Sequence, residues 1–363
     1  MARLGDYVRI RTGKLDANAS SENGQYSFFT CAVEPLKIDA YSYDCECVLV
    51  AGNGDLNVKY YNGKFDAYQR TYIIESLDKT ILSVPYLYCF LDKYVETLRQ
   101  QAIGGVIKYI KLGNLTEADI PIPSIAEQGK IVGNLSKSNE LIALRKEQIA
   151  KLDQLVKSRF IELFGDPSSN PMGWKETTVG EECHYIKDGP HKSLPDVGEG
   201  NGYPFISVRN IVNGYIDFST AKYISKQDYL DSIKKCHPQK GDMLYSKGGT
   251  TGIAKLVDVD VEFANWVHVA VLKFDDSLNG IFFENMLNSD YCYDQSQKLT
   301  KGIANRDLVL SAMAQIKMYK PPLELQEQFA AFVEQTDKSK LAIQHSLDKL
   351  ELLKKALMQE YFG

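Results

Sequence analysis

Two stretches with nearly the same pattern constrain the fold of this chain more than any other feature. Residues 151–165 read KLDQLVKSRFIELFG, and residues 349–363 read KLELLKKALMQEYFG. Aligning their FG endings places Leu152 opposite Leu350 and Glu162 opposite Glu360. An internal repeat of this kind indicates a duplicated architecture. We therefore expect two copies of one unit, each ending in a long helix.

The similarity extends upstream of both helices, with IPIPSIAEQ (120–128) matching YKPPLELQEQ (319–328) after a slip of about two residues. Further matches join LG (4–5) with VG (179–180), IRTG (10–13) with IKDG (186–189), YSFFT (26–30) with YPFIS (203–207), VLVAGNG (48–54) with MLYSKGG (243–249), and IGGVIKYIKL (103–112) with TKGIANRDLVL (300–310). The second copy carries additional residues, among them YISKQDYLDSIKKC (223–236). Duplication followed by divergence explains this pattern most simply.

The upstream part of each copy has the pattern of short strands and a few helices. VRNIVNGYIDF (208–218) predicts a hairpin around its Val-Asn-Gly turn, and WVHVAVLKF (266–274) predicts a strand. Residues 86–101 predict a helix, and the turn-rich segment 166–174 joins the copies. Each copy is therefore expected to be an α+β domain.

The long segments carry a seven-residue apolar repeat that predicts a helical partner. The repeat comprises Leu135, Ile142, Ile149, Val156 and Leu163, with Leu144, Leu152 and Leu155 between them, and then Ile343, Leu350 and Leu357, with Leu347 and Leu353 between them. Each helix could pack on its own domain. Pairing of the two helices with each other is the better-supported alternative, because both have the same seam, length and flanking motifs.

Composition indicates a soluble protein without an obvious secretion signal. No apolar run approaches the roughly 20 residues that a membrane span needs, and the N-terminal MARLGDYVRIRTG has charges where a signal peptide is apolar. The seven cysteines are odd in number and scattered, which indicates reduced thiols. Only Cys45 and Cys47 lie close together, and plain strand cysteines are favoured over a metal site. We expect a cytoplasmic protein that binds no metal.

The net charge of −5 argues mildly against a surface coated with phosphate-binding cations. It does not exclude a local basic cleft, because acidic helices elsewhere can offset such a cleft. Charge alone leaves nucleic-acid binding open.

Motifs of the common enzyme classes are not found in the sequence. GPHKS (189–193) and SKGGTTG (246–252) only approach a phosphate-binding G-x-x-x-x-G-K-[ST] loop, and neither H-E-x-x-H nor G-x-S-x-G occurs. NPMG (170–173) lacks the aromatic residue that amino-methyltransferases place after Asn-Pro-Pro. We therefore expect recognition rather than catalysis, and no catalytic residue.

Loops rich in Gly, Asn, Thr, Lys and Arg recur between the predicted strands of both copies. They are KDGPHKS (187–193), SVRNI (207–211) and SKGGTTG (246–252) in the second copy, and RTGKLDANAS (11–20), TCAV (30–33) and AGNGDLN (51–57) in the first. Glycine allows close backbone approach, cations neutralise phosphate, and Asn, Gln and Arg can bond base edges. These loops predict contact with a polyanion.

The order of these features resembles the DNA specificity subunit of type I restriction-modification systems, the HsdS family. The resemblance covers essentially the whole chain. It rests on IPIPSIAEQGKIV (120–132), KLDQLVKSRFIELFGDP (151–167), PPLELQEQFAAFVEQTDKSK (321–340), and SKGGTTG followed by KGIANRDL (301–308). The resemblance implies two target-recognition domains separated by two antiparallel helices that form a coiled coil, with each domain reading half of a bipartite double-stranded DNA site.

The resemblance also assigns residues and partners. In the second domain, the residues expected to face DNA are Lys187, His191, Lys192, Arg209, Asn210, Lys247, Thr250, Thr251, Lys301, Asn305 and Arg306. In the first domain, where IGGVIKYI replaces the polar KGIANRDL pattern, they are Arg11, Lys14, Asn53, Asn57, Arg70 and Lys108. Methylation subunits, usually two, and restriction subunits are the implied partners. Adenosylmethionine, ATP and magnesium would then lie on those partners, with no cofactor on this chain.

The expected division is a first target-recognition domain over residues 1–123, a central spacer helix over 124–166, a second domain over 167–321 and a C-terminal spacer helix over 322–363. A helix over residues 127–164 would be roughly 57 Å long at about 1.5 Å per residue, equal to about 17 base pairs at about 3.4 Å each. Half-sites one helical turn apart fit within that length, so the helices could act as a ruler. A protein-interaction scaffold, or an orphan specificity chain without restriction activity, remains the alternative.

Overall fold

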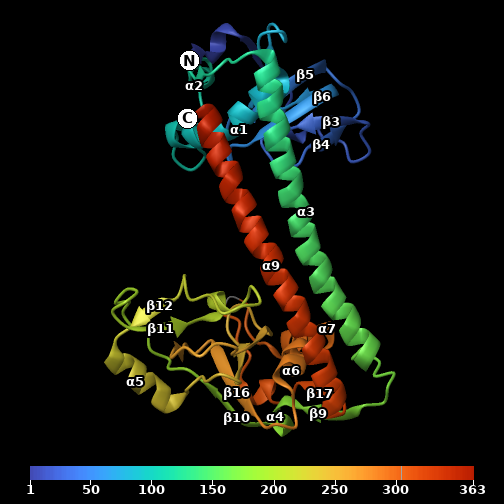
Figure 1. The fold of residues 1–363 in the computed structure, drawn as a ribbon, viewed down its shortest axis with the longest axis vertical. Helices are drawn as coiled ribbons and strands as arrows, with labels where there is room; N and C mark the ends of the chain where they lie inside the picture. Colours follow the sequence, from blue (N-terminus) through green and yellow to red (C-terminus); the bar gives the residue numbers. More distant parts are fainter. Residues whose placement is uncertain (304) are drawn as a thin grey trace. The chain divides into compact units, whose positions relative to one another are not determined.

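The computed structural model describes residues 1–303 and 305–363 (Figure 1). The chain divides into two compact units. Unit 1 comprises Met1–Gln148 together with Ile343–Gly363, and unit 2 comprises Ile149–Ala342. Both units combine helices with strands, so the α+β class predicted from the sequence is confirmed.

Unit 1 is built on a six-stranded sheet with the order β2-β7-β5-β6-β3-β4, while β1 and β8 form a separate pair. In the large sheet β3 runs parallel to β6, and the other neighbouring strands are antiparallel. The elements are β1 (Ala2–Arg3), β2 (Val8–Thr12), β3 (Tyr26–Phe29), β4 (Leu36–Ile38), β5 (Tyr43–Ala51), β6 (Val58–Ala67), β7 (Thr71–Ser76), α1 (Val84–Gln101), α2 (Leu112–Thr116) and β8 (Asp119–Ile120).

The central strand β5 shows why the sheet forms. Its side chains alternate between two faces, as the pleat of a strand requires. Val48 and Val50 face the main core of unit 1, and Cys47 and Leu49 join a second cluster on the other face. The main core is closed by α1, where the predicted helix is confirmed with Pro85 in its first turn, a position that lacks a helical N–H partner anyway.

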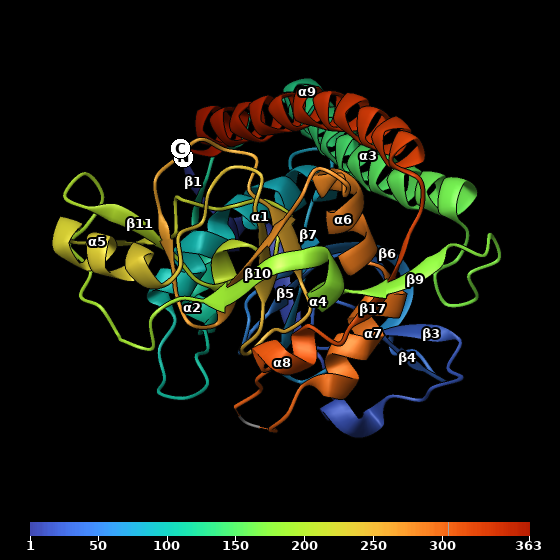
Figure 2. The ribbon, with the colours of Figure 1, turned by 90° about the horizontal axis from the view of Figure 1, so that it is seen from below.

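Unit 2 distributes its strands over a four-stranded sheet, β10-β16-β13-β14, and a three-stranded sheet, β12-β11-β15. β9 pairs with β17, the strand that directly precedes the long C-terminal helix (Figure 2). The elements are β9 (Lys175–Thr178), α4 (Val179–Glu182), β10 (Cys183–Asp188), β11 (Tyr203–Ile206), β12 (Lys222–Ile224), α5 (Lys226–Lys235), β13 (Met243–Ser246), β14 (Ala254–Leu256), β15 (Ala264–Asn265), β16 (Val269–Phe274), α6 (Gly280–Leu287), α7 (Asp290–Leu299), α8 (Leu310–Met313) and β17 (Lys317–Lys320). The strand predicted at 266–274 is confirmed over Val269–Phe274 as β16, whereas residues 266–268 form a turn before it.

The two long helices are α3 (Ile125–Phe164) and α9 (Leu323–Phe362). Within unit 1, Lys146 pairs with Glu351 and Asn134 bonds to Tyr361. A later residue of α3 thus meets an earlier residue of α9, so the stretches run antiparallel there (Figure 1). Unit 2 has the same arrangement, since Asp153 pairs with Lys340 and Phe160 packs on Phe329.

Both expected modes of helix packing occur, at different places. The helix ends enter the cores of the units, as Leu135 and Phe362 do in unit 1 and Phe164 and Phe329 do in unit 2. The seventh-residue positions of the apolar repeat are all buried or half-buried. The prediction was wrong for three intervening leucines, which are 46–49% exposed: Leu144, Leu155 and Leu353. Two paired helices bury only a narrow stripe, and these side chains lie beside it.

Two glutamines establish the register of the repeat. Gln128 and Gln326 are both fully buried. Each accepts a hydrogen bond from the N–H of a helix-capping residue, Ser83 in unit 1 at 2.9 Å and Asn279 in unit 2 at 2.8 Å. The expected slip of about two residues between IPIPSIAEQ and YKPPLELQEQ was therefore wrong. Gln128 and Gln326 differ by the same 198 positions as Gly165 and Gly363, so the pairs align without a gap.

Candidate nucleic-acid interface

In unit 2, a buried lysine joins three of the predicted loop segments. Lys247, which follows β13, is only 5% exposed. Its Nζ lies 2.8 Å from Asp307 and 3.5 Å from Asp188 at the end of β10, and Asp188 also pairs with Lys235 at 2.7 Å. Because its charge is enclosed and paired within the unit, Lys247 joins these loops in the structure.

Two more predicted residues are also enclosed. Thr251 is 1% exposed, and its hydroxyl lies 3.0 Å from that of Thr300. Asn210 is likewise 1% exposed. Its side chain accepts a 2.9 Å hydrogen bond from the Ser207 N–H and donates a 3.0 Å bond to the Asp217 carbonyl. These side chains hold loops in shape.

Asn210 also explains why the hairpin predicted at 208–218 is wrong. Val208–Asn210 forms one turn of 3-10 helix, and no strand follows before β12. The Asn210 amide bonds to backbone groups on both sides of the loop and so replaces the cross-strand ladder of a hairpin. Hydrogen bonds from Ser219 and Thr220 lower the pKa of Asp217 and stabilise its charged form within this loop.

The other predicted residues of unit 2 are exposed. Among them, Arg209 donates to the Thr220 carbonyl at 3.0 Å, Arg306 bonds to Gln297, and the Lys187 ammonium lies 5.2 Å from the centre of the Tyr185 ring. The exposed set is Lys187, His191, Lys192, Arg209, Thr250, Lys301, Asn305 and Arg306. Ala304, which lies within the expected 301–306 stretch, is outside the described residues.

Unit 1 brings its predicted segments together through backbone hydrogen bonds. The Gly52 N–H donates to the Arg70 carbonyl at 2.8 Å, and the Gly54 N–H donates to the Lys108 carbonyl at 2.9 Å. The Gly13 N–H donates to the Thr71 carbonyl at 3.1 Å, which adds the segment that carries Lys14. The ends of β2, β5 and β7 therefore form one edge with the 103–109 segment.

Some of the predicted side chains at this edge are paired within the unit, and others are exposed to solvent. Arg11 pairs with Glu75 and lies 5.1 Å from the centre of the Tyr43 ring, and burial raises the pKa of Tyr43. Asn57 donates to the Cys31 carbonyl at 2.8 Å, and Asn53 pairs through its backbone with Tyr109. Lys14, Arg70 and Lys108 are exposed. These three cations are the ones best placed to meet an anionic ligand.

Equivalent hairpins lie at the candidate interface in both units. In unit 1, Ile103 and Tyr109 exchange backbone hydrogen bonds of 2.9 and 3.0 Å, and in unit 2 Lys301 and Asp307 exchange two of 2.9 Å. The Gly249 N–H donates to the Arg306 carbonyl at 3.0 Å, as Gly54 does to Lys108. The sequence match between IGGVIKYIKL and TKGIANRDLVL is thus a structural equivalence, although the residue types differ.

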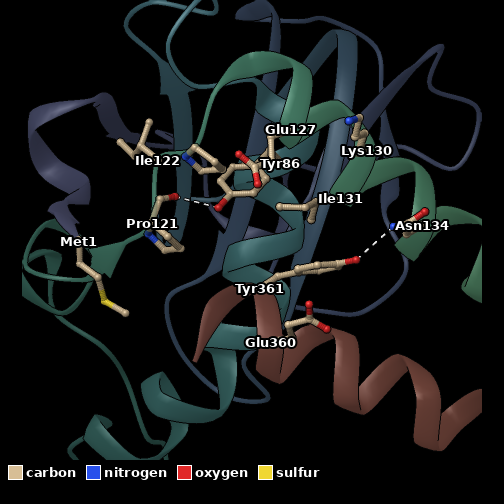
Figure 3. A pocket seen from close by; sticks show the side chains of 11 residues that line it. Met1, Tyr86, Pro121, Ile122, Glu127, Lys130, Ile131, Asn134, Glu360 and Tyr361 are labelled. Carbon is tan, nitrogen blue, oxygen red and sulfur yellow. Dashed lines mark hydrogen bonds between the residues drawn. The ribbon is translucent and has the colours of Figure 1, made fainter.

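Two of the cavities in the units bear on the candidate interface. One of about 640 Å³ in unit 1 is lined by residues from the start of α3 and the end of α9, where Tyr86 donates to the Pro121 carbonyl at 2.8 Å and Asn134 donates to the Tyr361 hydroxyl at 3.1 Å (Figure 3). None of the predicted DNA-facing residues lines it. The other, of about 270 Å³ in unit 2, is lined by Ser193, Leu194, Phe205, Ser207, Arg209, Lys222 and Trp266.

Trp266 is a residue that the sequence analysis placed only in a strand. It lines the smaller cavity, as Arg209 does, and its ring centre lies 4.6 Å from that of His268. Aromatic rings and arginines that line the same surface are common in nucleic-acid interfaces. The only sequence signal was its position at the start of the apolar run WVHVAVLKF (266–274).

Comparison with known proteins assigns nearly the whole chain to the family that its sequence resembles. The family model described as "Type I restriction modification DNA specificity domain" matches residues 1–154 and again residues 171–353. The chain belongs to this family. The two matched regions correspond to the two copies inferred from the repeat.

Relatives with curated names agree. The specificity subunit of the type I restriction enzyme EcoDI from Escherichia coli is 37% identical over 42% of this chain, a match that spans 34% of that protein. The specificity subunit of MjaVIII from Methanocaldococcus jannaschii is 22% identical, and the match covers 99% of this chain and 90% of the relative.

Solved structures show the shared fold. The S subunit of a type I restriction-modification system from M. genitalium has a TM-score of 0.64 at 17% identity, covering 100% of this chain and 95% of that one. A chain from a study of complex assembly and conformational transition in the type I system has a TM-score of 0.56 at 18% identity, covering 99% and 96%.

Among the described residues, no helix combines the length and apolar character needed to cross a membrane.

Proposed function

We propose that this chain is a non-catalytic DNA-specificity subunit, in which each unit reads one half of a bipartite double-stranded site. The observation that carries the proposal is the edge built in both units from the same strand ends and the same hairpin, on which different side chains are displayed. A shared framework with divergent exposed cations and amides suits reading of two different half-sites.

Site selection tests this function. The chain would be purified with its methylation subunits and used to select ligands from a library of random duplexes. We expect enrichment of two short sequences separated by a gap of constant length and undefined sequence. Enrichment of no discontinuous sequence would contradict the proposal and favour a protein scaffold.

Salt dependence identifies the phosphate contacts. We propose that Lys108 and Arg306 occupy equivalent positions on the two hairpins and contact the DNA. Lys108→Gln or Arg306→Gln should lower the slope of log affinity against log salt concentration by about 1. Lys79→Gln is the matched control, because this exposed lysine follows β7 at the opposite end of the sheet from Thr71 and pairs with Glu46. An equal loss of slope in the control would remove the assignment.

Two methylation subunits are proposed to dock on the long helices, and restriction subunits to join that assembly. Leu155 and Leu353 support this, because they occupy equivalent positions of the repeat and are 47% and 49% exposed. Leu155→Glu and Leu353→Glu should each weaken binding of one methylation subunit, as measured by the mass of the purified complex. Retention of both subunits by the double variant would place the docking surface elsewhere.

Adenosylmethionine, ATP and magnesium would be bound by the methylation and restriction subunits.

The helices are also proposed to act as a ruler between the half-sites. Each has 40 residues, which corresponds to about 60 Å at about 1.5 Å per residue. Inserting matched whole turns into both helices should lengthen the undefined gap of the selected site. An unchanged gap in a folded insertion variant would refute the ruler.

The seven cysteines are free thiols, which suits the reducing cytoplasm as the place of action.

A further inference from the structure

The equivalent hairpins of the two units share an unusual backbone constraint. Each has a glycine with positive φ at the second position, Gly104 at +117° and Gly302 at +86°. A Cβ on Gly104 would lie 2.5 Å from the Ile107 carbonyl oxygen, and one on Gly302 would lie 2.2 Å from the Asn305 carbonyl oxygen. Because both contacts are closer than atoms allow, each hairpin needs glycine to make its turn. The same glycine requirement therefore recurs in both units.

Both hairpins carry apolar side chains that the described residues of their own unit leave exposed. Val106 is fully exposed at 103% and its neighbour Ile107 is 63% exposed, while Ile303 is 100% exposed. Single exposed apolar residues are common on protein surfaces. Here exposed apolar side chains recur at adjacent positions of two equivalent hairpins. Chance exposure of single residues does not explain this recurrence.

The charges around these tips favour an anionic partner. The first hairpin, IGGVIKY, has no acidic residue and carries the exposed Lys108. The second carries the exposed Lys301 and Arg306, and its acid, Asp307, is paired with Lys247. A surface with an apolar centre and a cationic border complements duplex DNA, whose stacked bases lie between two rows of phosphates.

Backbone contacts place the tips within the candidate interface. The first hairpin bonds to the Gly-rich loop after β5 through Gly54, and the second bonds to the loop after β13 through Gly249. Leu308 also donates to the Lys247 carbonyl at 2.7 Å, as Ile110 does to the Gly52 carbonyl at 2.9 Å. A duplex that contacts these loops therefore meets the hairpins as well.

We propose that both hairpins are wedges that enter a groove of the DNA and press an apolar side chain between or against base pairs, bending the duplex within each half-site. Val106 with Ile107 acts in unit 1, and Ile303 acts in unit 2. Inserted apolar side chains partly unstack a base step, and flanking cations hold the phosphates on either side. Specificity then includes how easily a step deforms, in addition to the base edges that are read directly. This inference rests on the proposed function.

The test uses the purified complex and the duplex that it selects. A fluorescent 2-aminopurine would be placed at successive steps of each half-site, and the bend would be measured by the mobility of circularly permuted fragments. We expect one step in each half-site to brighten on binding, together with a measurable bend. Ile303→Ser should abolish the signal in one half-site, and Val106→Ser with Ile107→Ser should abolish it in the other. Affinity should fall by about tenfold in each case.

Controls separate the wedge from general effects. Val261→Ser in unit 2 and Leu77→Ser in unit 1 remove apolar side chains of 45% and 57% exposure outside the hairpins and should leave fluorescence and bend unchanged. Ile303→Leu should retain both signals. Arg306→Gln should reduce the salt slope while the brightening persists at saturating protein.

Three outcomes would overturn the proposal. A selected site that shows neither brightening nor bend with the wild-type complex overturns the wedge alone. So does a serine variant that keeps the distortion but loses a methylation subunit, because the tip would then contact protein. Selection of no bipartite site by the wild type would overturn the proposed function and the wedge with it.

Discussion

Unit 1 and unit 2 share one strand order but differ in how it is divided. In unit 1 the long strand β6 bonds to β5 along most of its length and to β3 at its end, so six strands form a single sheet. In unit 2 its place is taken by β14 and β15, which are separated by residues 257–263 and belong to different sheets. The order of neighbours is retained although the sheet is interrupted.

This difference shows which parts of the unit tolerate change. Strand continuity and loop length vary between the copies, whereas close backbone contacts and buried polar anchors recur. Both tryptophans, Trp174 and Trp266, belong to unit 2, so tryptophan fluorescence reports the unfolding of that unit separately. The comparison can therefore be tested one unit at a time.

The largest effect is expected at a pair of equivalent glycines. A Cβ on Gly13 would lie 2.0 Å from the Ala67 carbonyl oxygen, and one on Gly189 would lie 1.8 Å from that of Asn265. Either Gly→Ala change should destabilise its unit by about 4 kcal/mol, because backbone must move to admit the methyl group. Gly189→Ala should shift the tryptophan-monitored denaturation curve, and Gly13→Ala should shift only the curve followed by circular dichroism.

A glycine in open space supplies the control for this pair. Gly133 of α3 has no heavy atom within 4 Å of an added Cβ, so Gly133→Ala should stabilise unit 1 by about 1 kcal/mol. A shift of the tryptophan curve by Gly13→Ala would show that the units do not unfold separately.

The buried glutamines should give the next largest effect. Gln128→Leu would leave the capping N–H of Ser83 and the Pro123 carbonyl without a hydrogen-bond partner. Gln326→Leu would do the same to the N–H of Asn279 and the Pro321 carbonyl. Each change should cost about 3 kcal/mol, since several buried polar groups lose hydrogen bonds at once. Gln328→Leu, at an exposed position, should change stability by less than about 0.5 kcal/mol. Equal effects at Gln326 and Gln328 would reject the register without a gap.

Unit 2 contains a buried lysine, Lys247, with ion pairs to Asp188 and Asp307. Unit 1 lacks this cluster, because Gly52 occupies the equivalent position. Lys247→Met should destabilise unit 2 by about 2 kcal/mol, below the 3–5 kcal/mol typical of a broken buried ion pair. The effect is smaller because Asp188 keeps Lys235 and the Asp307 side chain is 44% exposed. Tryptophan-monitored denaturation measures it, with the exposed Lys298→Met as control. No effect would mean that the cluster does not organise the loops.

The smallest effect is expected from the ion pairs between the helix stretches. Lys146→Ala in unit 1 removes an exposed pair, and Lys340→Ala in unit 2 removes a partly exposed one. Each should cost about 0.5 kcal/mol or less, and the difference should vanish in high salt. A loss well above this in one unit alone would show that its helix pairing depends on charge.

The sequence predicted the parts of the fold that depend on periodicity. The two long helices, the helix that became α1 and the strand that became β16 all have a clear apolar repeat. The hairpin expected at 208–218 failed because the amide of Asn210 binds the backbone across the loop, an effect that no local pattern displays.

The candidate site was predictable as a set of loops but less so as individual side chains. The loop that carries Lys247 and Thr251 is joined to the second hairpin, yet both side chains are buried because partners distant in sequence enclose them. Asn210 is buried by hydrogen bonds within its own loop. Ile303 and Val106 escaped notice for the opposite reason. An apolar residue in a sequence suggests core, and only the structure shows that these side chains are exposed.

Unit 1 is assembled from two parts of the chain, and this has a consequence for the order of events during synthesis. Its core includes Met358 and Phe362, whose ring lies 5.4 Å from that of Tyr86 and 5.9 Å from that of Phe90. A ribosome adding about 5–20 residues per second needs roughly 10–40 s to travel from Gln148 to Ile343. Unit 2, which is continuous, can close during that interval. The first unit begun is thus the last one finished, and until then its nascent apolar surface is open to chaperones.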